Sequence, residues 1–307
     1  MATFASVTFN TARYAAVRPT YPKQLYEFIF DYHRRHPAAQ LETAVDLGCG
    51  TGQATVDLTP FKHVIGVDPS MKMVESARAS LSTLGAVDRA KFRFEESSAE
   101  NVAILDDGTV DLIIAAQSGH WFGYDKVWPE VARLLRPGGS VALWCYSEMR
   151  LTNFPSLTPL ITDYFNGTDP RNSIGPYWEQ PGRSILEGHL LKVPSATDVL
   201  PAKFSEFERI FFTGDHFPEL PSPHPVIMRK QMSWDDFLAW LYTTSSLHTF
   251  HERFPEDRER SDGDIAVRFW KRLRQATRSE PGNGSDEAIE VEWPLALILG
   301  RRAYGVE

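Results

Sequence analysis

The apolar positions in the first half of the chain alternate between short continuous runs and longer amphipathic stretches. Mainly apolar and β-branched segments with the length of a strand recur at 43–47, 62–68, 110–116 and 140–146, and at 91–95 apolar and charged residues alternate as in a strand. Segments with apolar residues every three or four positions predict helices at about 22–36, 52–58, 70–81 and 124–135. Because strands that alternate with helices along a chain form a parallel sheet, this pattern predicts a doubly wound α/β sheet.

The second half is less regular. Its first part, 151–201, is rich in proline, glycine and aromatic residues. The pattern after it predicts a strand at 204–213, a loop at 214–232, helices at about 233–247 and 262–277, and a long strand at 289–300 that contains Pro294. Two late strands separated by a helical insertion fit an antiparallel sheet edge. We therefore expect one domain over 1–307, made of a cap segment at 1–40, a core at 41–150, an inserted lid at 151–285 and a terminal strand at 286–307.

Composition narrows the class of partner. The phosphate backbone of a nucleic acid attracts basic proteins, whereas this chain has a net charge of −8. No nucleic-acid partner is therefore expected. No apolar run approaches the length of a membrane span, and the first ten residues lack the pattern of a secretory signal. Cys49 and Cys145 are typical of reduced, intracellular usage. These features predict a cytoplasmic monomer or homodimer that acts on a small molecule, with no membrane partner and no bound metal.

A glycine-rich segment follows the first predicted strand. Asp46-Leu47-Gly48-Cys49-Gly50-Thr51-Gly52-Gln53 places glycines at alternate positions before a helix start. Glycines permit positive φ and remove the Cβ atoms that would keep a ligand off the backbone. Dinucleotide sites use the spacing G-x-G-x-x-G, and here Gln53 stands where the third glycine would be. The spacing therefore argues against a dinucleotide; a turn without a ligand is the alternative.

Other polar residues follow the later strands. Asp68 ends the second strand roughly 20 residues after the first glycine, where an acid is placed to accept both hydroxyls of a ribose. A small polar cluster, Ser97–Glu100, follows the third strand, and Gln117–Phe122 follows the fourth. Ligands of open α/β sheets bind beyond the carboxyl ends of the strands, so the segment after the fourth strand points at a reaction centre.

With these motifs in register, the first 150 residues resemble a class I S-adenosylmethionine-dependent methyltransferase. Over nearly its whole length the chain is similar to the fungal trans-aconitate methyltransferases. The residues that carry the similarity are Arg13-Tyr14, Arg18–Pro22, His120-Trp121-Phe122, Gly175–Ser184 and Arg229-Lys230-Gln231. The segments near 190–205 and 214–226 match less clearly, which leaves the shape of the pocket open.

The resemblance implies a seven-stranded Rossmann-like sheet with an antiparallel edge and an inserted helical lid. It also implies that S-adenosylmethionine is the cofactor, S-adenosylhomocysteine the product, and a carboxylate of a small organic acid the methyl acceptor. Residues expected to bind the cofactor are Asp46, Gly48, Gly50, Gln53, Asp68, Met71, Ser98, Ala99 and Gln117. Residues expected to face the reacting groups are Tyr14, Gln117 and His120. Residues expected to bind the acceptor are Arg18, Tyr21, Tyr177, Trp178, Arg183 and Arg229.

The nature of the acceptor decides what chemistry the protein must supply. A carboxylate has a pKa near ~4, so it is ionised at neutral pH and needs no base. It needs cationic clamps, and the planar fork of arginine suits this task. A phenolic or other hydroxyl acceptor would instead need a base such as His120. The remaining alternative is a protein that binds the cofactor without turnover.

Four of these candidate residues could have a structural role in place of the functional one. Asp46 could serve only to orient the glycine loop, and His120 could be a satisfied structural histidine. Arg183 could pair with Glu179, and Arg229 could belong to a solvated edge.

Overall fold

The computed structural model describes residues 19–280 and 288–304. The described chain divides into two compact units. The first, here called the sheet unit, contains Thr20–Tyr146, Ser184–Ile227 and the described residues from Leu295 onward. The second, here called the helical unit, contains Ser147–Arg183 and the described residues within Met228–Pro294, together with Pro19. The expected partition of a single domain into cap, core, lid and terminal strand stays a prediction.

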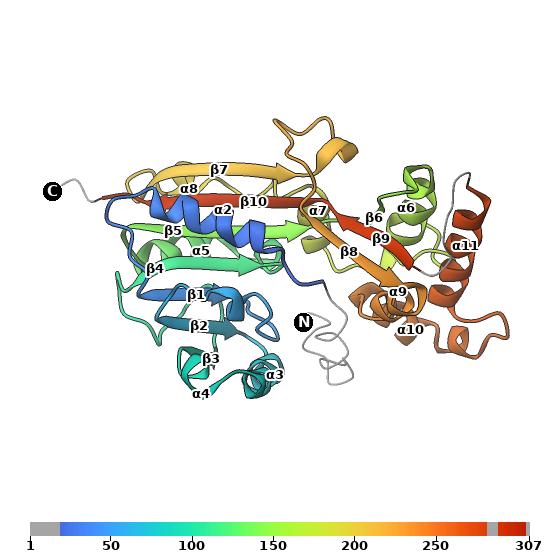
Figure 1. Cartoon of the computed structure of the whole chain (residues 1–307), viewed down its shortest axis with the longest axis horizontal. Coiled ribbons are helices and arrows are strands. Elements are labelled where there is room, and N and C mark those ends of the chain that lie inside the picture. Colours follow the sequence, from blue (N-terminus) through green and yellow to red (C-terminus); the bar gives the residue numbers. More distant parts are fainter. Residues whose placement is uncertain (1–18, 281–287, 305–307) are drawn as a thin grey trace. The chain divides into compact units, whose positions relative to one another are not determined.

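The sheet unit is built on a seven-stranded sheet with the strand order β3-β2-β1-β4-β5-β10-β7 (Figure 1). The strands are β1 Thr43–Leu47, β2 His63–Asp68, β3 Phe92–Glu96, β4 Val110–Ala116, β5 Leu135–Tyr146, β7 Phe204–Phe212 and β10 Leu295–Arg302. Strands β1 to β5 run parallel, whereas β10 lies antiparallel between β5 and β7. The predicted Rossmann-like sheet with an antiparallel edge is confirmed.

The strand order reverses between β1 and β4, which are neighbours in the sheet although β2 and β3 lie between them in the chain. In doubly wound sheets the ligand crevice forms at such a switch point, beyond the carboxyl ends of the strands. Strand β4 is buried from Val110 to Ala115, which explains why its sequence is apolar apart from Asp111. The fold thus brings the ends of β1, β2 and β4 to one edge.

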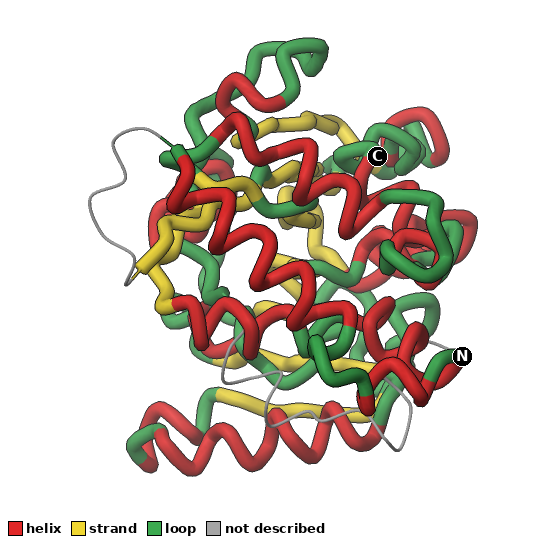
Figure 2. The backbone as a smooth tube through the Cα atoms, turned by 90° about the vertical axis from the view of Figure 1, so that its right-hand side faces the viewer, coloured by secondary structure: helices red, strands yellow, loops and turns green. Residues whose placement is uncertain are grey.

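Helices and short 3-10 turns lie between the strands of this unit in the sequence. Figure 2 shows the helices of the chain in red and its strands in yellow. The helices of the sheet unit are α2 Lys23–Arg34, α3 Met71–Ser80, α4 Ala86–Arg89, α5 Tyr124–Leu134, α7 Gly182–Glu187 and α8 Ala196–Val199, with short 3-10 turns η2 Thr55–Asp57, η3 Leu81–Thr83, η4 Gly119–Trp121 and η7 Gly214–His216. The helix expected at 52–58 is wrong, because only the 3-10 turn η2 forms there. Gly52 has a positive φ of 82°, and Pro60 disfavours a helical Thr59, so few residues remain for a helix.

The helical unit contains a second sheet that the sequence did not predict, with the order β6-β9-β8. Its strands are β6 Arg150–Leu151, β8 Met228–Ser233 and β9 Ala288–Trp293. The prediction of a loop over 214–232 is therefore wrong at its C-terminal end, where β8 forms. The strand expected at 289–300 is also two strands, because Pro294 separates β9 from β10 and the two belong to different sheets. Proline lacks the N–H that a continuous ladder needs.

The remaining helices of this unit are α6 Thr158–Asn166, α9 Trp234–Leu241, α10 Ser245–Arg253 and α11 Ile265–Ser279, with 3-10 turns η5 Pro155–Leu157, η6 Gly175–Tyr177 and η8 Pro255–Glu259. The helix expected at 233–247 is split into α9 and α10. The hydroxyls of Thr243 and Thr244 donate hydrogen bonds to the carbonyls of Trp240 and Leu241, and the backbone of Thr244 is extended. Such side-chain bonds compete with the helical ladder and end α9.

Three further features concern the residues that the structure describes. None of the described helices is long and apolar enough to cross a membrane. Cys49 and Cys145 are both buried and free. The described ranges contain no group of three or more His, Cys, Asp or Glu side chains that could hold a metal ion.

Candidate functional site

The glycine loop after β1 has three residues with positive φ, namely Gly48 at 70°, Gly50 at 54° and Gly52 at 82°. A Cβ on Gly48 would lie 2.6 Å from the Cβ of Ser118, and one on Gly52 would lie 2.9 Å from the Phe94 ring. A Cβ on Gly50 would meet no atom of the described residues within 4 Å. Two of the glycines are thus required by close packing, while Gly50 faces open space where a ligand can approach the backbone.

Asp68, at the end of β2, holds two neighbouring segments together. Its Oδ2 accepts a hydrogen bond of 3.0 Å from the Gly50 N–H, and its Oδ1 accepts one of 2.9 Å from the Ser70 N–H. Burial raises the pKa of this carboxyl, and the two N–H donors oppose that rise. A carboxylate oxygen has more than one lone pair, so both oxygens can still accept the hydroxyls of a ribose.

Asp46 carries an unsatisfied acceptor two residues before the glycine loop. Its side chain is fully buried, and its Oδ2 accepts a 2.6 Å hydrogen bond from the Thr55 hydroxyl. Its Oδ1 is buried and has no hydrogen-bond partner within the described ranges. Burial, helped by the charge of Asp68, raises the pKa of Asp46 to about 7. Because a buried carboxylate oxygen without a donor is costly, this atom fits a cationic group of a ligand, such as an α-ammonium.

The residues expected around an adenine lie after β2 and β3. Met71 begins α3 and is 40% exposed although it is apolar. Ala99 is buried, and Ser98 forms a bridge with Asn101. The Ser97 N–H donates to the main-chain carbonyl of Asp68 at 3.1 Å, so this segment is tied to the end of β2. An exposed methionine beside a fixed polar turn can cover the face of a flat ring. Gln53 is half-buried directly after the loop.

Gln117 follows β4 with a φ of 56°, a left-handed conformation that is uncommon outside glycine. Its amide Nε2 donates to the Tyr146 carbonyl at 3.0 Å, and its Oε1 accepts from the Tyr146 N–H at 2.8 Å. Both functions of the side-chain amide are therefore bound to the end of β5. The expected contact of Gln117 with a methyl donor stays a prediction, and the main chain is the part of Gln117 that can make it.

His120 lies in η4, and its side chain is only 6% exposed. Its Nδ1 lies 3.3 Å from the Sγ of Cys145, and its ring centroid lies 4.7 Å from that of Trp121. Cys145 was not expected at the site. Its only signal in the sequence is its place near the end of the strand next to β4, where Ala116 aligns with Trp144.

The residues expected to bind the acceptor lie in several places. Tyr14 and Arg18 are outside the described residues. Tyr21 belongs to the sheet unit, and its ring meets the Trp144 ring edge-on at a centroid distance of 5.3 Å. In the helical unit, the Tyr177 hydroxyl donates to the Pro170 carbonyl at 2.7 Å.

Trp178 and Arg183 form a stack within the helical unit. The Trp178 Nε1 donates to the Phe165 carbonyl at 2.7 Å, which fixes the indole. The Arg183 guanidinium lies over that ring at 4.0 Å from its centroid, and its Nη2 donates to the Asn166 Oδ1 at 2.9 Å. The guanidinium is thus held in plane by a ring face and an amide, which preorganises it for a planar anion.

Arg229 is bound across the small sheet. Its Nε donates to Glu292 Oε2 at 2.8 Å, and the two residues face each other where β8 pairs with β9. The Glu292 side chain is only 6% exposed, whereas that of Arg229 is 49% exposed. The ion pair with Glu292 compensates the charge of Arg229, which makes Arg229 a weak candidate for an anion clamp.

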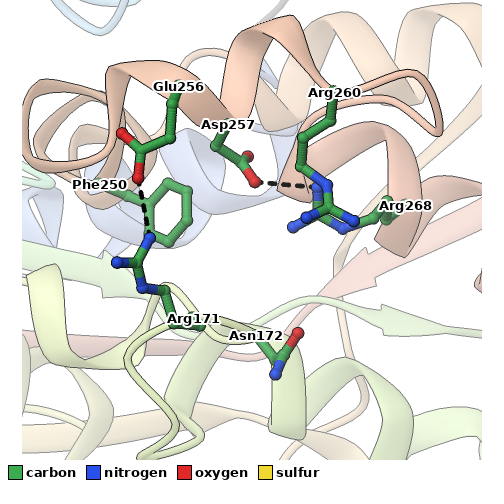
Figure 3. A pocket seen from close by; sticks show the side chains of 7 residues that line it. All are labelled: Arg171, Asn172, Phe250, Glu256, Asp257, Arg260 and Arg268. Atoms are coloured by element: carbon green, nitrogen blue, oxygen red, sulfur yellow. Dashed lines mark hydrogen bonds and ion pairs between the residues drawn. The ribbon is translucent and has the colours of Figure 1, made fainter.

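The helical unit also contains a cavity of about 260 Å³, shown in Figure 3. It is lined by Arg171, Asn172, Phe250, Glu256, Asp257, Arg260 and Arg268, none of which the sequence singled out. Each guanidinium has a carboxylate neighbour: Arg171 pairs with Glu256 and Arg268 pairs with Asp257, both at 2.9 Å, and Arg260 pairs with Asp262. These pairs cancel the positive charge, so the cavity does not favour an anion.

Comparisons with known proteins agree with this geometry. The family described as "Methyltransferase domain" matches residues 45–143, the region from β1 to β5. Probable S-adenosylmethionine-dependent methyltransferase CRG1 of Saccharomyces cerevisiae is 31% identical over 310 residues, covering 97% of this chain and 98% of CRG1. Methyltransferase cfoB of Aspergillus candidus is 26% identical over 98% of this chain and 96% of its own length.

A solved structure from Anaeromyxobacter dehalogenans, described as a type II methyltransferase, is also similar. It is 25% identical, covers 92% of this chain and 97% of its own, and superposes with a TM-score of 0.64. Glycines, the Asp68 carboxylate and the unsatisfied Asp46 oxygen fit S-adenosylmethionine at the ends of β1 and β2. The chain therefore belongs to the S-adenosylmethionine-dependent methyltransferases.

Proposed function

We propose that this enzyme transfers a methyl group from S-adenosylmethionine to a carboxylate oxygen of a small organic acid of the trans-aconitate type. The products are a methyl ester and S-adenosylhomocysteine. The observation that carries the proposal is the Arg183 guanidinium stacked over Trp178 at 4.0 Å. Both residues belong to the Gly-Pro-Tyr-Trp-Glu-Gln-Pro-Gly-Arg run of this chain, which is one of the segments that carry the resemblance to the trans-aconitate methyltransferases.

The cofactor, when bound, supplies an activated methyl group on a sulfonium. The protein must then orient the acceptor, and orientation alone can lower a barrier by roughly 7–11 kcal/mol. We assign to Arg183 the task of holding one acceptor carboxylate through its planar fork. Stacking on Trp178 and the bond to Asn166 restrict the guanidinium before the acceptor arrives, so less entropy is lost on binding.

On the cofactor side, the chain's own residues bind and orient. We assign the ribose hydroxyls to Asp68, whose carboxylate also accepts hydrogen bonds from the Gly50 and Ser70 amides. Asp46 offers its unsatisfied Oδ1 to the α-ammonium. Met71 and Ala99 are assigned to the adenine. The acceptor carboxylate is already ionised at neutral pH, so methyl transfer to it needs no general base. The proposed mechanism therefore requires only residues that bind and orient the cofactor and the acceptor.

The test is turnover of S-adenosylmethionine with a panel of acceptors. We expect turnover with di- and tricarboxylates such as trans-aconitate, and none with phenols of similar size. Turnover with phenols alone would replace the proposal by hydroxyl methylation. Binding of the cofactor without turnover of any acceptor would favour a protein that does not catalyse transfer.

A matched pair of arginine variants tests the clamp. Arg183→Ala should raise KM for the acid by about 10- to 100-fold, because a hydrogen bond to a charged group contributes about 1.5–3 kcal/mol, and it should leave KM for the cofactor unchanged. Arg171 is the control, because its guanidinium also stacks on an aromatic ring of the same unit, Phe254, at 3.9 Å. Arg171→Ala should leave both KM values unchanged. Equal effects of the two variants would remove the clamp assignment.

A further inference from the structure

The sheet opens between β1 and β4, because the pairing of β1 ends earlier on that side than on the other. The β1–β2 pairing extends to Leu47, which aligns with Val67. The β1–β4 pairing ends at Asp46, which aligns with Ile114, although β4 itself continues to Ala116. The glycine loop therefore begins where β1 has lost its ladder partner on the β4 side, at the switch point where doubly wound sheets bind their ligands.

The main chain of the glycine loop is bound to β2. The N–H groups of Gly48 and Cys49 both donate to the Val67 carbonyl, at 2.8 and 2.9 Å. The Gly50 N–H donates to the Oδ2 of Asp68 at 3.0 Å. These bonds fix the loop relative to β2, and its position relative to β4 is set by a different contact.

That contact is the Ser118 hydroxyl, which reaches across the opening. Its Oγ donates to the carbonyl of Leu47, the last residue of β1, at 2.6 Å. A carbonyl oxygen can only accept, so the hydroxyl is the donor. Leu47 is fully buried and Ser118 is 8% exposed, so the bond is shielded from solvent. A Cβ on Gly48 would lie 2.6 Å from the Cβ of Ser118, which shows how closely the two segments approach.

Ser118 is held from the other side by the residue before it. The Gln117 N–H donates to the Trp144 carbonyl at 2.8 Å, and the side-chain amide bonds both the N–H and the carbonyl of Tyr146. A left-handed φ of 56° persists in a residue other than glycine where the surrounding contacts enforce it, and such residues cluster at functional sites. The turn after β4 is thus fixed to β5, and Ser118 extends this attachment to the glycine loop.

We propose that Ser118 is a positioning residue for the cofactor: its bond to Leu47 holds the glycine loop at a fixed distance from the turn after β4. A ligand that lies across a switch point contacts the segments on both of its sides. Because the two sides are held at their spacing before S-adenosylmethionine binds, less conformational freedom is lost on binding. This role concerns the cofactor alone and is the same for any methyl acceptor.

The first test measures the loop in the ligand-free, full-length protein. Ser118→Ala should speed amide hydrogen exchange of residues 48–52 by about 2- to 10-fold, as expected for one lost hydrogen bond. Ser140→Ala is the matched control, because Ser140 is also a buried serine of this sheet, with its Oγ 3.0 Å from the His33 Nδ1. It aligns with Leu112 near the beginning of β4, away from the opening, and its loss should leave exchange of the loop unchanged.

The second test measures the Kd for S-adenosylmethionine by titration calorimetry. Ser118→Ala should raise this Kd by about 2- to 10-fold, whereas Ser140→Ala should leave it unchanged. Ser118→Cys replaces the hydroxyl by a weak S–H donor, so it should show both changes at smaller size, and it replaces the alanine variant if that variant does not fold.

The proposal requires both changes together. Faster exchange with an unchanged Kd would make the bond purely structural, and a raised Kd with unchanged exchange would make the hydroxyl a direct contact of the cofactor. Either result would overturn the positioning role, as would equal effects of Ser140→Ala. Neither measurement uses a methyl acceptor, so the outcome is independent of the proposed function.

Discussion

Asp46→Asn is expected to stabilise this protein against unfolding and to lower its affinity for the cofactor. Burial raises the pKa of Asp46 from an ordinary value of 3.8 to about 7. A raised pKa means that the folded state binds the proton more tightly than the unfolded state does. Ionised Asp46 therefore costs stability, and the cost grows as the pH rises from about 4 and is complete above about pH 7.

The magnitude follows from the shift. The difference between 7 and 3.8 is about 3 pKa units, and each unit corresponds to 1.36 kcal/mol, so the cost above pH 7 is about 4 kcal/mol. An asparagine at this position is neutral at every pH, and its amide oxygen can still accept from the Thr55 hydroxyl, which now donates at 2.6 Å. At pH 8 the variant should gain up to this amount, whereas at pH 4.5 the two proteins should differ little.

The assay is urea unfolding of the cofactor-free protein at pH 4.5, 6 and 8, followed by tryptophan fluorescence. Asp163→Asn, at an exposed position of α6, is the control for the general effect of removing a carboxylate. A stability difference between Asp46→Asn and wild type that does not grow with pH would refute the reasoning. So would a gain of equal size in Asp163→Asn.

The gain in stability should come with a loss of binding. If the unsatisfied Oδ1 receives the cofactor's α-ammonium, the neutral variant should bind S-adenosylmethionine about 10- to 100-fold more weakly, because a hydrogen bond between charged groups contributes about 1.5–3 kcal/mol. Titration calorimetry measures this directly. A folded state that tolerates a costly carboxylate for the sake of a ligand is a known trade-off between stability and function. Unchanged affinity would leave Asp46 with the structural role of orienting the loop.

Three further predictions concern other parts of the molecule. Asp68→Asn should raise the Kd for S-adenosylmethionine by about tenfold or more with an unchanged circular dichroism spectrum; equal affinity by calorimetry would remove the ribose assignment. Gly66→Ala places a Cβ 2.5 Å from the buried Phe94 ring and should cost about 1–3 kcal/mol in urea unfolding, whereas Gly85→Ala, with its nearest contact at 3.8 Å, should cost much less. Burial lowers the pKa of His251, so stability should be complete above the ordinary value of 6.5 and decline as the pH falls below it, and His251→Gln should flatten that decline.

The sequence predicted those parts of the fold that local pattern determines. Strand β4 was found because a strand covered on both faces has a continuous apolar sequence. Strand β8 was missed because Arg229, Lys230 and Gln231 give it a polar sequence, and only its pairing with β9 makes it a strand. The break at Pro294 was visible, but its effect, which is to place β9 and β10 in different sheets, depends on long-range pairing.

The same distinction applies to the candidate site. The glycine loop and Asp68 were predicted because their spacing along the chain sets their geometry. The partners of Gln117 and Arg229 were not, because Tyr146 and Glu292 reach them only through strand packing and register. The Cys145 contact with His120 belongs to the same class, since neighbouring strands and not sequence distance bring the sulfur to the ring.

The central claim, transfer to a carboxylate, is tested most directly by the chemistry of the product. The enzyme is incubated with S-adenosylmethionine labelled in the methyl group and with trans-aconitate, and the purified product is treated with mild alkali. A methyl ester releases its label as volatile methanol, whereas an aryl methyl ether keeps it. The account predicts a labelled acid whose label is released, in an amount that matches the S-adenosylhomocysteine formed. Label that resists alkali, or that appears only on a phenolic acceptor, would contradict it.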